Sequence, residues 1–180
     1  MRTVKQRGAQ IVLALWLAAT TLAAADPASA AEPLEASVKA AYLAKFAFYV
    51  DWPPAAFVSP TAPVVLCIVA DDAFGALVEE AATGQVVQGR GIAVKRLKAV
   101  NRESGCHIAY VGAEAKLDAV KGSPVLVVTD AQGGNGIINF VLRDNRVRFT
   151  VDDDLAAQFG LSISSKLLNV ALAVKPRGAR

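Results

Sequence analysis

Residues 64–70 (VVLCIVA) form a continuous apolar run that is rich in β-branched side chains. A run of this length and composition is typical of a strand that is covered on both faces, as in a parallel sheet. Two runs of the same kind lie downstream, at residues 106–111 (CHIAYV) and 124–129 (PVLVVT), and residues 92–97 (IAVKRL) suit an edge strand. We therefore predict four strands of one sheet in this part of the chain.

Helices are predicted between these strands. Asp71 and Asp72 begin one that ends near Ala82, because acidic residues are favourable at a helix N-terminus. Residues 113–121 form another, and residues 84–91 are turn-rich. The alternation of strands and helices implies a largely parallel sheet with helices on its faces.

The C-terminal part breaks this alternation. Residues 137–142 (IINFVL) and 147–151 (VRFTV) flank an Asp-Asn pair at 144–145, which is typical of the tight turn of a β-hairpin. The predicted fold is thus a single α/β domain. It has a mixed, largely parallel sheet of about six strands, helices on both faces and a C-terminal hairpin.

A helix is predicted over residues 37–50, before the first strand. Ser37 is in place to cap it, and the Trp-Pro-Pro sequence that follows residue 51 ends it. Apolar side chains occupy nearly every face of this helix, which indicates that it is buried. Lys39 and Lys45 must therefore reach solvent or meet partners.

Two helices are predicted after the hairpin. The first spans residues 152–159 and ends at Gly160. Its Asp-Asp-Asp sequence, 152–154, lacks the glycine and terminal glutamate of a calcium loop, so helix capping explains these acids better than a metal site. The second spans residues 165–174 and is capped by Ser164.

The first thirty residues have the three parts of a secretory signal peptide. A basic start precedes a strongly apolar run at residues 11–19, and the Ala-Ser-Ala sequence 28–30 supplies the small residues that signal peptidase requires. We predict cleavage after Ala30, which leaves residues 31–180 as one periplasmic domain. Cleavage after Ala25 and retention as an anchor are the alternatives, although a spanning helix needs about 20 mostly apolar residues.

Charge gives no reason to expect a nucleic-acid partner. The whole chain has a formal net charge of +3. The signal segment holds three basic residues and one acid, so its removal leaves about +1. A nearly neutral domain lacks the basic surface that binding to nucleic acid requires.

Cys67 and Cys106 are the two cysteines of the chain. An even number in an oxidising compartment favours a disulfide between them, with two buried thiols as the alternative. A zinc site is not expected, because the only histidine, His107, is adjacent to Cys106 and no further soft ligands exist.

Neither a catalytic set nor a cofactor site is predicted. The glycine-rich sequence 133–136 lacks the lysine and the following helix of a phosphate-binding loop, so we interpret it as a turn before the hairpin. His107 lies within a predicted strand and beside a cysteine, which favours a structural role over that of a general base. The protein is therefore not predicted to be an enzyme.

Two groups of side chains are candidates for contact with a partner. The predicted hairpin carries three arginines, Arg143, Arg146 and Arg148. They form either a solvated strand face or a contact patch for an acidic partner or an anionic ligand. Tyr49 and Trp52, with Lys45 one turn back, lie around the end of the first helix. They either pack in the core or form an aromatic docking surface.

Several segments together resemble the YfiR family of periplasmic proteins (YfiR/HmsC-like). In chain order they are KAAYLAKFAFYVDWP, VVLCIVADDAFG, CHIAYVG, GIINFVLRDNRVRFTVD and GLSISSKLLNVALAV, within residues 38–174. Cys67 and Cys106 match the positions of a family disulfide, whereas a second cysteine pair of some relatives is absent here. The SSKLL segment adds Ser164 and Lys166 to the candidate contact residues.

The resemblance implies a binding module that needs no cofactor. We expect it to restrain an inner-membrane diguanylate cyclase by contacting the cyclase's periplasmic domain, which keeps cyclic-di-GMP and biofilm formation low. An outer-membrane lipoprotein and a second copy of the chain are further partners that the resemblance implies. The alternative function is a periplasmic small-ligand sensor or accessory binding subunit coupled to another membrane receptor.

Overall fold

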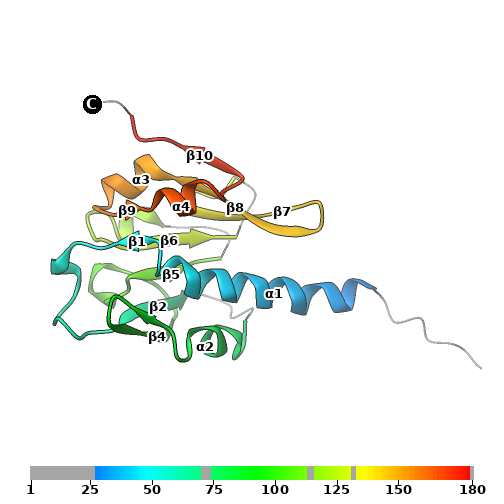
Figure 1. The fold of residues 1–180 in the computed structure, drawn as a ribbon, viewed down its shortest axis with the longest axis horizontal. Coiled ribbons are helices and arrows are strands. Elements are labelled where there is room, and N and C mark those ends of the chain that lie inside the picture. Colours follow the sequence, from blue (N-terminus) through cyan, green and yellow to red (C-terminus); the bar gives the residue numbers. More distant parts are fainter. Residues whose placement is uncertain (1–26, 70–73, 113–115, 131–132, 179–180) are drawn as a thin grey trace, which may run out of the picture.

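The computed structural model describes residues 27–69, 74–112, 116–130 and 133–178. A mixed sheet of eight strands forms the centre of this part of the chain, and two short strands pair beside it (Figure 1). The predicted single α/β domain with a mixed, largely parallel sheet is thereby confirmed. Most of the predicted signal peptide lies outside the described residues.

The strand order of the large sheet is β10-β8-β7-β6-β5-β2-β4-β3. Its strands are β2 (Val64–Val69), β3 (Val86–Val87), β4 (Arg90–Leu97), β5 (Ile108–Tyr110), β6 (Leu126–Thr129), β7 (Ile138–Arg143), β8 (Arg146–Asp152) and β10 (Ala173–Lys175). Neighbouring strands are parallel except in the pairs β7–β8 and β3–β4. The two strands beyond the six predicted, β3 and β10, are short and lie at the sheet edges.

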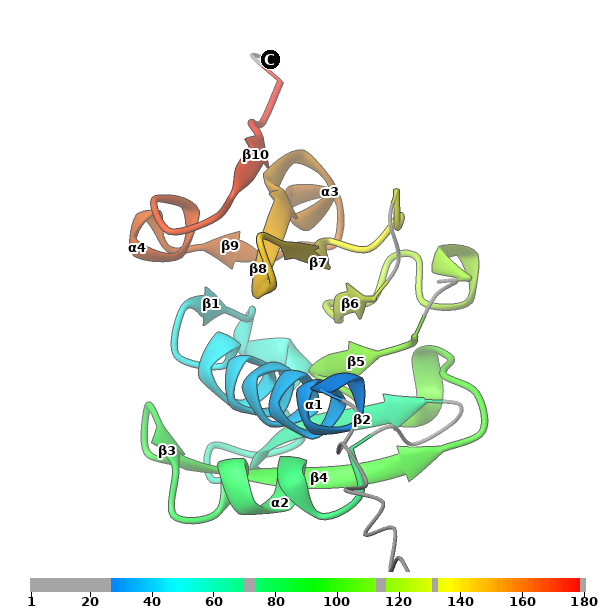
Figure 2. The same ribbon diagram turned by 90° about the vertical axis from the view of Figure 1, so that its right-hand side faces the viewer.

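The helix α1 (Pro27–Phe46) lies along one face of this sheet (Figure 2). Both predicted boundaries are wrong, because Ser37 lies inside the helix and the helix ends before residue 50. It begins upstream of Ser37, where the sequence is rich in alanine, the best helix former. It ends early because β1 (Val50–Asp51) pairs with β9 (Ser162–Ile163), which requires extended backbone.

The other helical segments are short. They are α2 (Leu77–Ala82), α3 (Asp153–Gln158), α4 (Ser165–Leu168) and the 3-10 turns η1 (Pro54–Ala56), η2 (Arg102–Ser104) and η3 (Leu117–Ala119). Asp71 and Asp72, the predicted start of the first of these helices, lie outside the described residues. The helix predicted at residues 113–121 is wrong, since its described part holds only η3 before the chain turns into β6 at a Gly-Ser-Pro sequence.

The C-terminal elements mix confirmed and wrong predictions. α3 begins at its Asp152 cap, and Gly160 follows with a φ of 71°, as a left-handed helix stop requires. Ser164 caps α4 as predicted, but this helix does not continue to residue 174. The chain instead extends as β10 beside β8, where Leu172 N–H also binds the carbonyl of Phe149 at 2.8 Å. Sheet hydrogen bonds here override helix propensity.

The predicted hairpin is confirmed. Asp144 and Asn145 have positive φ angles of 50° and 55°, as the two central residues of a type I′ turn require. Arg143 lies opposite Arg146 in the antiparallel register. The loop of this hairpin reaches past the body of the sheet, beside the N-terminal part of α1 (Figure 1).

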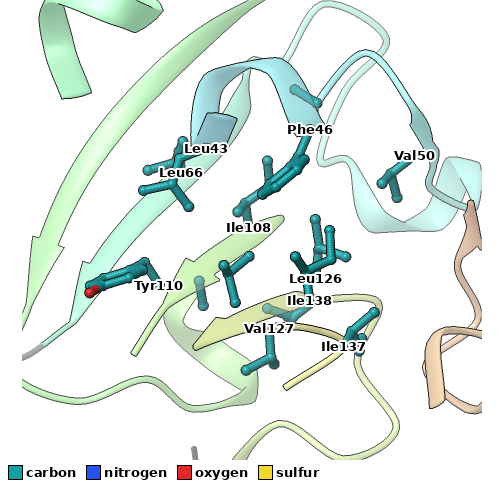
Figure 3. Packing of buried hydrophobic residues seen from close by; sticks show 14 of the residues in the cluster. Leu43, Phe46, Val50, Leu66, Ile108, Tyr110, Leu126, Val127, Ile137 and Ile138 are labelled. Carbon is teal, nitrogen blue, oxygen red and sulfur yellow. The ribbon is translucent and has the colours of Figure 1, made fainter. Parts of the chain in front are cut away.

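The hydrophobic core lies between α1 and the sheet. Leu43 and Phe46 of α1 point toward Leu66, Ile108 and Leu126 of the central strands (Figure 3). All five side chains are fully buried, and burial of each contributes roughly 1.5–3 kcal/mol before entropy is counted. α4 lies on the same side of the sheet as α1, and α3 lies on the other (Figure 2).

None of the helices in residues 27–178, as far as these are described, combines the length and the hydropathy needed to cross a membrane. Pro27 and the Ala-Ser-Ala sequence 28–30 belong to α1. The position after Ala30, where cleavage is predicted, therefore lies within the first turns of this helix, and cleavage there would leave the part of α1 that contacts the core in place.

Candidate functional site

An apolar groove of about 530 Å³ lies between α1 and α4. Its lining residues are Val38, Ala41, Tyr42, Lys45, Phe46, Tyr49, Phe149, Lys166, Leu167 and Val170. Three residues that the sequence nominated for partner contact, Lys45, Tyr49 and Lys166, are thus brought together. Ser164, another nominated residue, is not among the lining residues but adjoins two of them as the cap of α4: its N–H donates to the carbonyl of Tyr49 at 2.8 Å, and its Oγ accepts the Lys166 N–H at 3.3 Å.

Local structure explains how α1 and α4 come to face each other. Val50 and Ile163 pair in the two-stranded sheet β1–β9, and Ser164 N–H donates to the carbonyl of Tyr49 at 2.8 Å. These bonds hold the start of α4 against the end of α1. Phe149 of β8 forms the floor, where its ring meets that of Phe46 edge-on at 5.3 Å.

Among the described residues, Lys45 and Lys166 are the only charged ones that line this groove. Both side chains are exposed, and neither forms an ion pair with a carboxylate anywhere in the described part of the chain. The sequence predicted that each lysine of α1 reaches solvent or meets a partner, and Lys45 reaches solvent. The groove therefore combines an apolar wall with uncompensated positive charge.

A second groove, of about 300 Å³, lies between α1 and the hairpin. It is lined by Leu34, Glu35, Val38, Leu142, Asn145, Arg146 and Val147. Val38 lines both grooves, so they adjoin along α1. Sequence reasoning missed Leu34 because it placed the helix start after this residue, and an earlier start would have shown Leu34 one turn before Val38.

The three arginines of the hairpin share one strand face. Arg143 and Arg146 are opposite each other, and Arg148 lies two residues beyond Arg146 on the same strand. All three therefore lie on the face of the hairpin that is opposite to the face of Phe149. They are exposed. Of the three, Arg146 is the one that lines the second groove among the described residues. Arg143 and Arg148 lie in solvent on the strand face that they share with it.

Trp52 lies away from both grooves, although it is three residues from Tyr49. Its Nε1–H donates to the carbonyl of His107 at 3.2 Å, and the two rings meet edge-on. Phe57 stacks on His107 with 4.4 Å between ring centroids, and Arg90 lies over the Phe57 ring at 3.9 Å from its centroid. Trp52 therefore belongs to a structural cluster with His107, Phe57 and Arg90.

His107 has both ring nitrogens engaged with backbone groups. Its Nδ1 accepts the Val65 N–H at 3.0 Å, so the proton is on Nε2, which donates to the carbonyl of Ala56 at 3.2 Å. Burial lowers the pKa of this imidazole below its usual value of 6.5. The ring has no free nitrogen with which to act as a general base, in agreement with the structural role predicted.

Cys67 and Cys106 form a disulfide, which confirms the predicted pairing. It joins β2 to the residue before His107. The bond therefore ties the His107 cluster to the centre of the sheet, and both cysteines are buried.

The Asp-Asp-Asp and glycine-rich segments, for which the sequence favoured structural roles over a metal or a phosphate site, have partners within the fold. Asp152 Oδ1 accepts the Leu155 N–H at 2.8 Å as a helix cap, and Asp153 pairs with Arg177 at 2.9 Å. Within the described residues, no group of three or more potential ligands could hold a metal ion. Gly136 packs so closely that an added Cβ would lie 2.9 Å from the carbonyl of Ile138, which explains a glycine before the hairpin.

A buried polar cluster that the sequence did not predict lies at the carboxyl ends of β5 and β6. Lys39 pairs with Glu35 and with Asp130, the latter at 2.6 Å, and the Tyr110 hydroxyl donates to Asp130 at 3.1 Å. Burial alone would lower the pKa of Lys39, but its hydrogen bonds to the two carboxylates raise it overall. Burial and the Asp130 charge raise the pKa of Tyr110. The cluster locks α1 to the sheet.

Comparison with known protein families now adds to this geometry. The family model described as YfiR/HmsC-like matches residues 36–172. The chain belongs to the YfiR/HmsC-like family. Members of this family are periplasmic, non-catalytic regulators that act on a diguanylate cyclase through protein–protein contact. A search of curated proteins found no match.

Proposed function

We propose that this YfiR/HmsC-like protein restrains an inner-membrane diguanylate cyclase by contacting the periplasmic domain of the cyclase, and so lowers cyclic-di-GMP output. The observation that carries the proposal is the family match over residues 36–172. This range includes the stretch of α1 from Ser37 onward, the hairpin and α4, which together surround the two grooves.

The groove between α1 and α4 supports a contact role. Apolar side chains that stay exposed beside uncompensated charge are typical of a surface that binds another molecule. We assign Lys45, Tyr49, Ser164 and Lys166 to this contact. The described groove offers an aromatic floor for a buried anchor and two cations for acidic groups around it.

Export is part of the proposal. The chain is made with a signal peptide that is removed after Ala30, so the mature protein meets the cyclase from the periplasmic side of the inner membrane. An outer-membrane lipoprotein that sequesters the protein and a homodimer are further partners. Each of these associations would hide or expose the surface along α1 and so control the restraint.

Deletion of the gene tests the proposal. We expect cyclic-di-GMP, measured by mass spectrometry of cell extracts, to rise, and a plasmid copy of the full chain to restore the lower level. A matched copy that lacks residues 1–30 stays in the cytoplasm and should restore nothing. An unchanged cyclic-di-GMP level after deletion would falsify the proposed function.

One observation favours a second function, that of a periplasmic small-ligand sensor coupled to another membrane receptor. The volume of the α1–α4 groove, about 530 Å³, lies within the range of small-molecule sites. A periplasmic metabolite that bound there would raise the melting temperature of the protein by mass action. A Lys45→Glu variant would lose this shift if the metabolite carries a negative charge.

A further inference from the structure

The two grooves are parts of one surface that follows α1. Leu34, Val38, Ala41 and Lys45 are spaced by three or four residues, so they lie on one stripe of the helix. At a rise of 1.5 Å per residue the stripe extends about 17 Å from Leu34 to Lys45. Val38 lines both grooves and joins them. The stripe is thus a continuous edge that runs along both grooves and joins them into one elongated surface.

Apolar side chains from two other elements form the walls of this surface. Leu142 and Val147 of the hairpin lie along the N-terminal part of the stripe, and Leu167 and Val170 of the α4 segment lie along its C-terminal part. Both walls lie on the same side of α1 (Figure 1). Leu142 is 53% exposed and Val170 is 59% exposed, so each wall presents a large apolar side chain to solvent.

Positive charge lies at both ends of the surface. Lys45 and Lys166 lie at one end and Arg146 at the other. Glu35 is the only acid that lines either groove in the part of the chain that the structure describes, and it pairs with Lys39. The lining therefore carries an excess of positive charge that an acidic binding partner would neutralise.

We propose that this surface, the α1 stripe with its two walls, binds an amphipathic helical segment that carries acidic residues and belongs to the membrane partner. The inference rests on the proposed function for the identity of the partner. A helix lays apolar anchors at i, i+3, i+4 and i+7 into a groove of this kind. Anchors of such a helix fill the spaces between Val38, Tyr42 and Val170, while acidic residues on its flanks meet the cations at each end.

The length of the surface and its charges distinguish this occupant from a small anionic amphiphile. A single carboxylate head meets the cations at one end only, whereas Lys45 and Arg146 lie at opposite ends of the stripe. About 17 Å corresponds to three turns of an α-helix, which is enough for acidic residues on the first and last turns. The bound segment therefore has acidic residues near both of its ends.

Site-specific photo-crosslinking in cells that contain the partner tests this inference. The photoreactive residue p-benzoylphenylalanine replaces Ala41, an exposed residue of the α1 stripe. As the matched control it replaces Val58, which is 98% exposed in a loop outside both grooves. Mass spectrometry of the crosslinked peptides then identifies the segment. We expect Ala41, and not Val58, to crosslink to an amphipathic segment of a membrane protein with acidic residues on both sides of its apolar face.

Charge reversal provides the second arm. We expect the double variant Lys45→Glu and Lys166→Glu to reduce crosslinking from position 41 by about tenfold or more, because like charges then meet across the interface. The variant Lys98→Glu with Lys121→Glu makes the same charge change at exposed lysines outside both grooves and should leave the yield unchanged.

Several outcomes would overturn the inference. They are a crosslink to a basic or uncharged segment, to residues 1–26 of this chain, to a second copy or to a small molecule, and the absence of any crosslink specific to position 41. None of these outcomes touches the proposed function, which the cyclic-di-GMP measurement tests. A rise in cyclic-di-GMP after deletion, together with a crosslink of the wrong kind, would leave the regulator intact and remove this surface from its mechanism.

Discussion

Tyr49 and Trp52 are three residues apart, yet they belong to regions of opposite character. Trp52 lies in a closed cluster in which its indole N–H, both nitrogens of His107 and the guanidinium of Arg90 all have partners. Tyr49 lies on the open surface along α1. There, Lys45 and Lys166 have no carboxylate partner among the described residues, and large apolar side chains are exposed.

The difference shows how a fold separates stability from recognition. In the closed cluster every buried polar group is satisfied, so loss of one partner leaves another group unpaired and destabilises the protein. On the open surface the groups that lack partners lose nothing within the protein when they are replaced. Substitutions should therefore affect unfolding in the first region and binding in the second.

The largest expected effect comes from the disulfide of the closed cluster. Replacement of Cys67 and Cys106 by alanine should lower the free energy of unfolding by about 2–4 kcal/mol, since the bond restricts the unfolded chain. Equilibrium unfolding in urea measures this change. A reducing agent should destabilise the wild-type protein by a similar amount and leave the double variant unaffected. Equal stability of variant and wild type would show that the cluster does not depend on the bond.

A matched pair of aromatic substitutions gives the next effect. Trp52→Phe removes the N–H that binds the carbonyl of His107, as well as part of a half-buried ring, so the free energy of unfolding should fall by about 1–2 kcal/mol. Tyr49→Phe removes the hydroxyl of a groove-lining residue and should change stability by less than about 0.5 kcal/mol. Urea unfolding compares the two, and equal losses would contradict the division between the regions.

Protonation of His107 should weaken the closed cluster. The resulting loss in the free energy of unfolding should be smaller than in the two predictions above and should develop gradually as the pH falls. Burial lowers the folded-state pKa of this histidine below 6.5, so the unfolded chain binds a proton first as the pH falls. Its contribution to stability is therefore fully present above about pH 6.5 and is lost as the pH falls toward the folded-state pKa. A protonated Nδ1 can no longer accept the Val65 N–H.

The chain offers a direct control for this pH dependence, because His107 is its only histidine. Unfolding free energies measured between about pH 7.5 and 5 should fall more steeply for the wild-type protein than for His107→Gln, which has no group that titrates in this range. Parallel pH profiles for the two proteins would show that folding does not lower the pKa of His107.

Much of the fold could be predicted because its signals are local. The three continuous apolar runs became β2, β5 and β6, and the Asp-Asn pair formed the hairpin turn. The errors have tertiary causes. The end of α1 and the short α4 both depend on strands that pair with distant residues, β1 with β9 and β10 with β8. Two- or three-residue strands leave no periodic pattern in a sequence.

The candidate site was predictable only in its parts. Sequence reasoning nominated Lys45, Tyr49 and Lys166, but only the pairing of β1 with β9 brings the two lysines to one groove. For both Lys39 and Lys45 it predicted that the side chain either reaches solvent or meets a partner. The rotation of α1 decides between them, since Lys39 points toward Asp130 and Lys45 points to solvent. Helix rotation depends on packing against the whole sheet, which no local pattern reveals.

The smallest expected effect on stability is the most informative about recognition. Lys45→Gln with Lys166→Gln should change the free energy of unfolding by less than about 0.5 kcal/mol, because neither ammonium group has a carboxylate partner among the described residues. The same variant, expressed at the wild-type level in the deletion strain, should fail to lower cyclic-di-GMP. Lys98→Gln with Lys121→Gln should lower it as the wild-type chain does. Full restraint by the groove variant would mean that the open surface is not where this protein meets the cyclase, and that the exposed lysines of α1 and α4 serve only solubility.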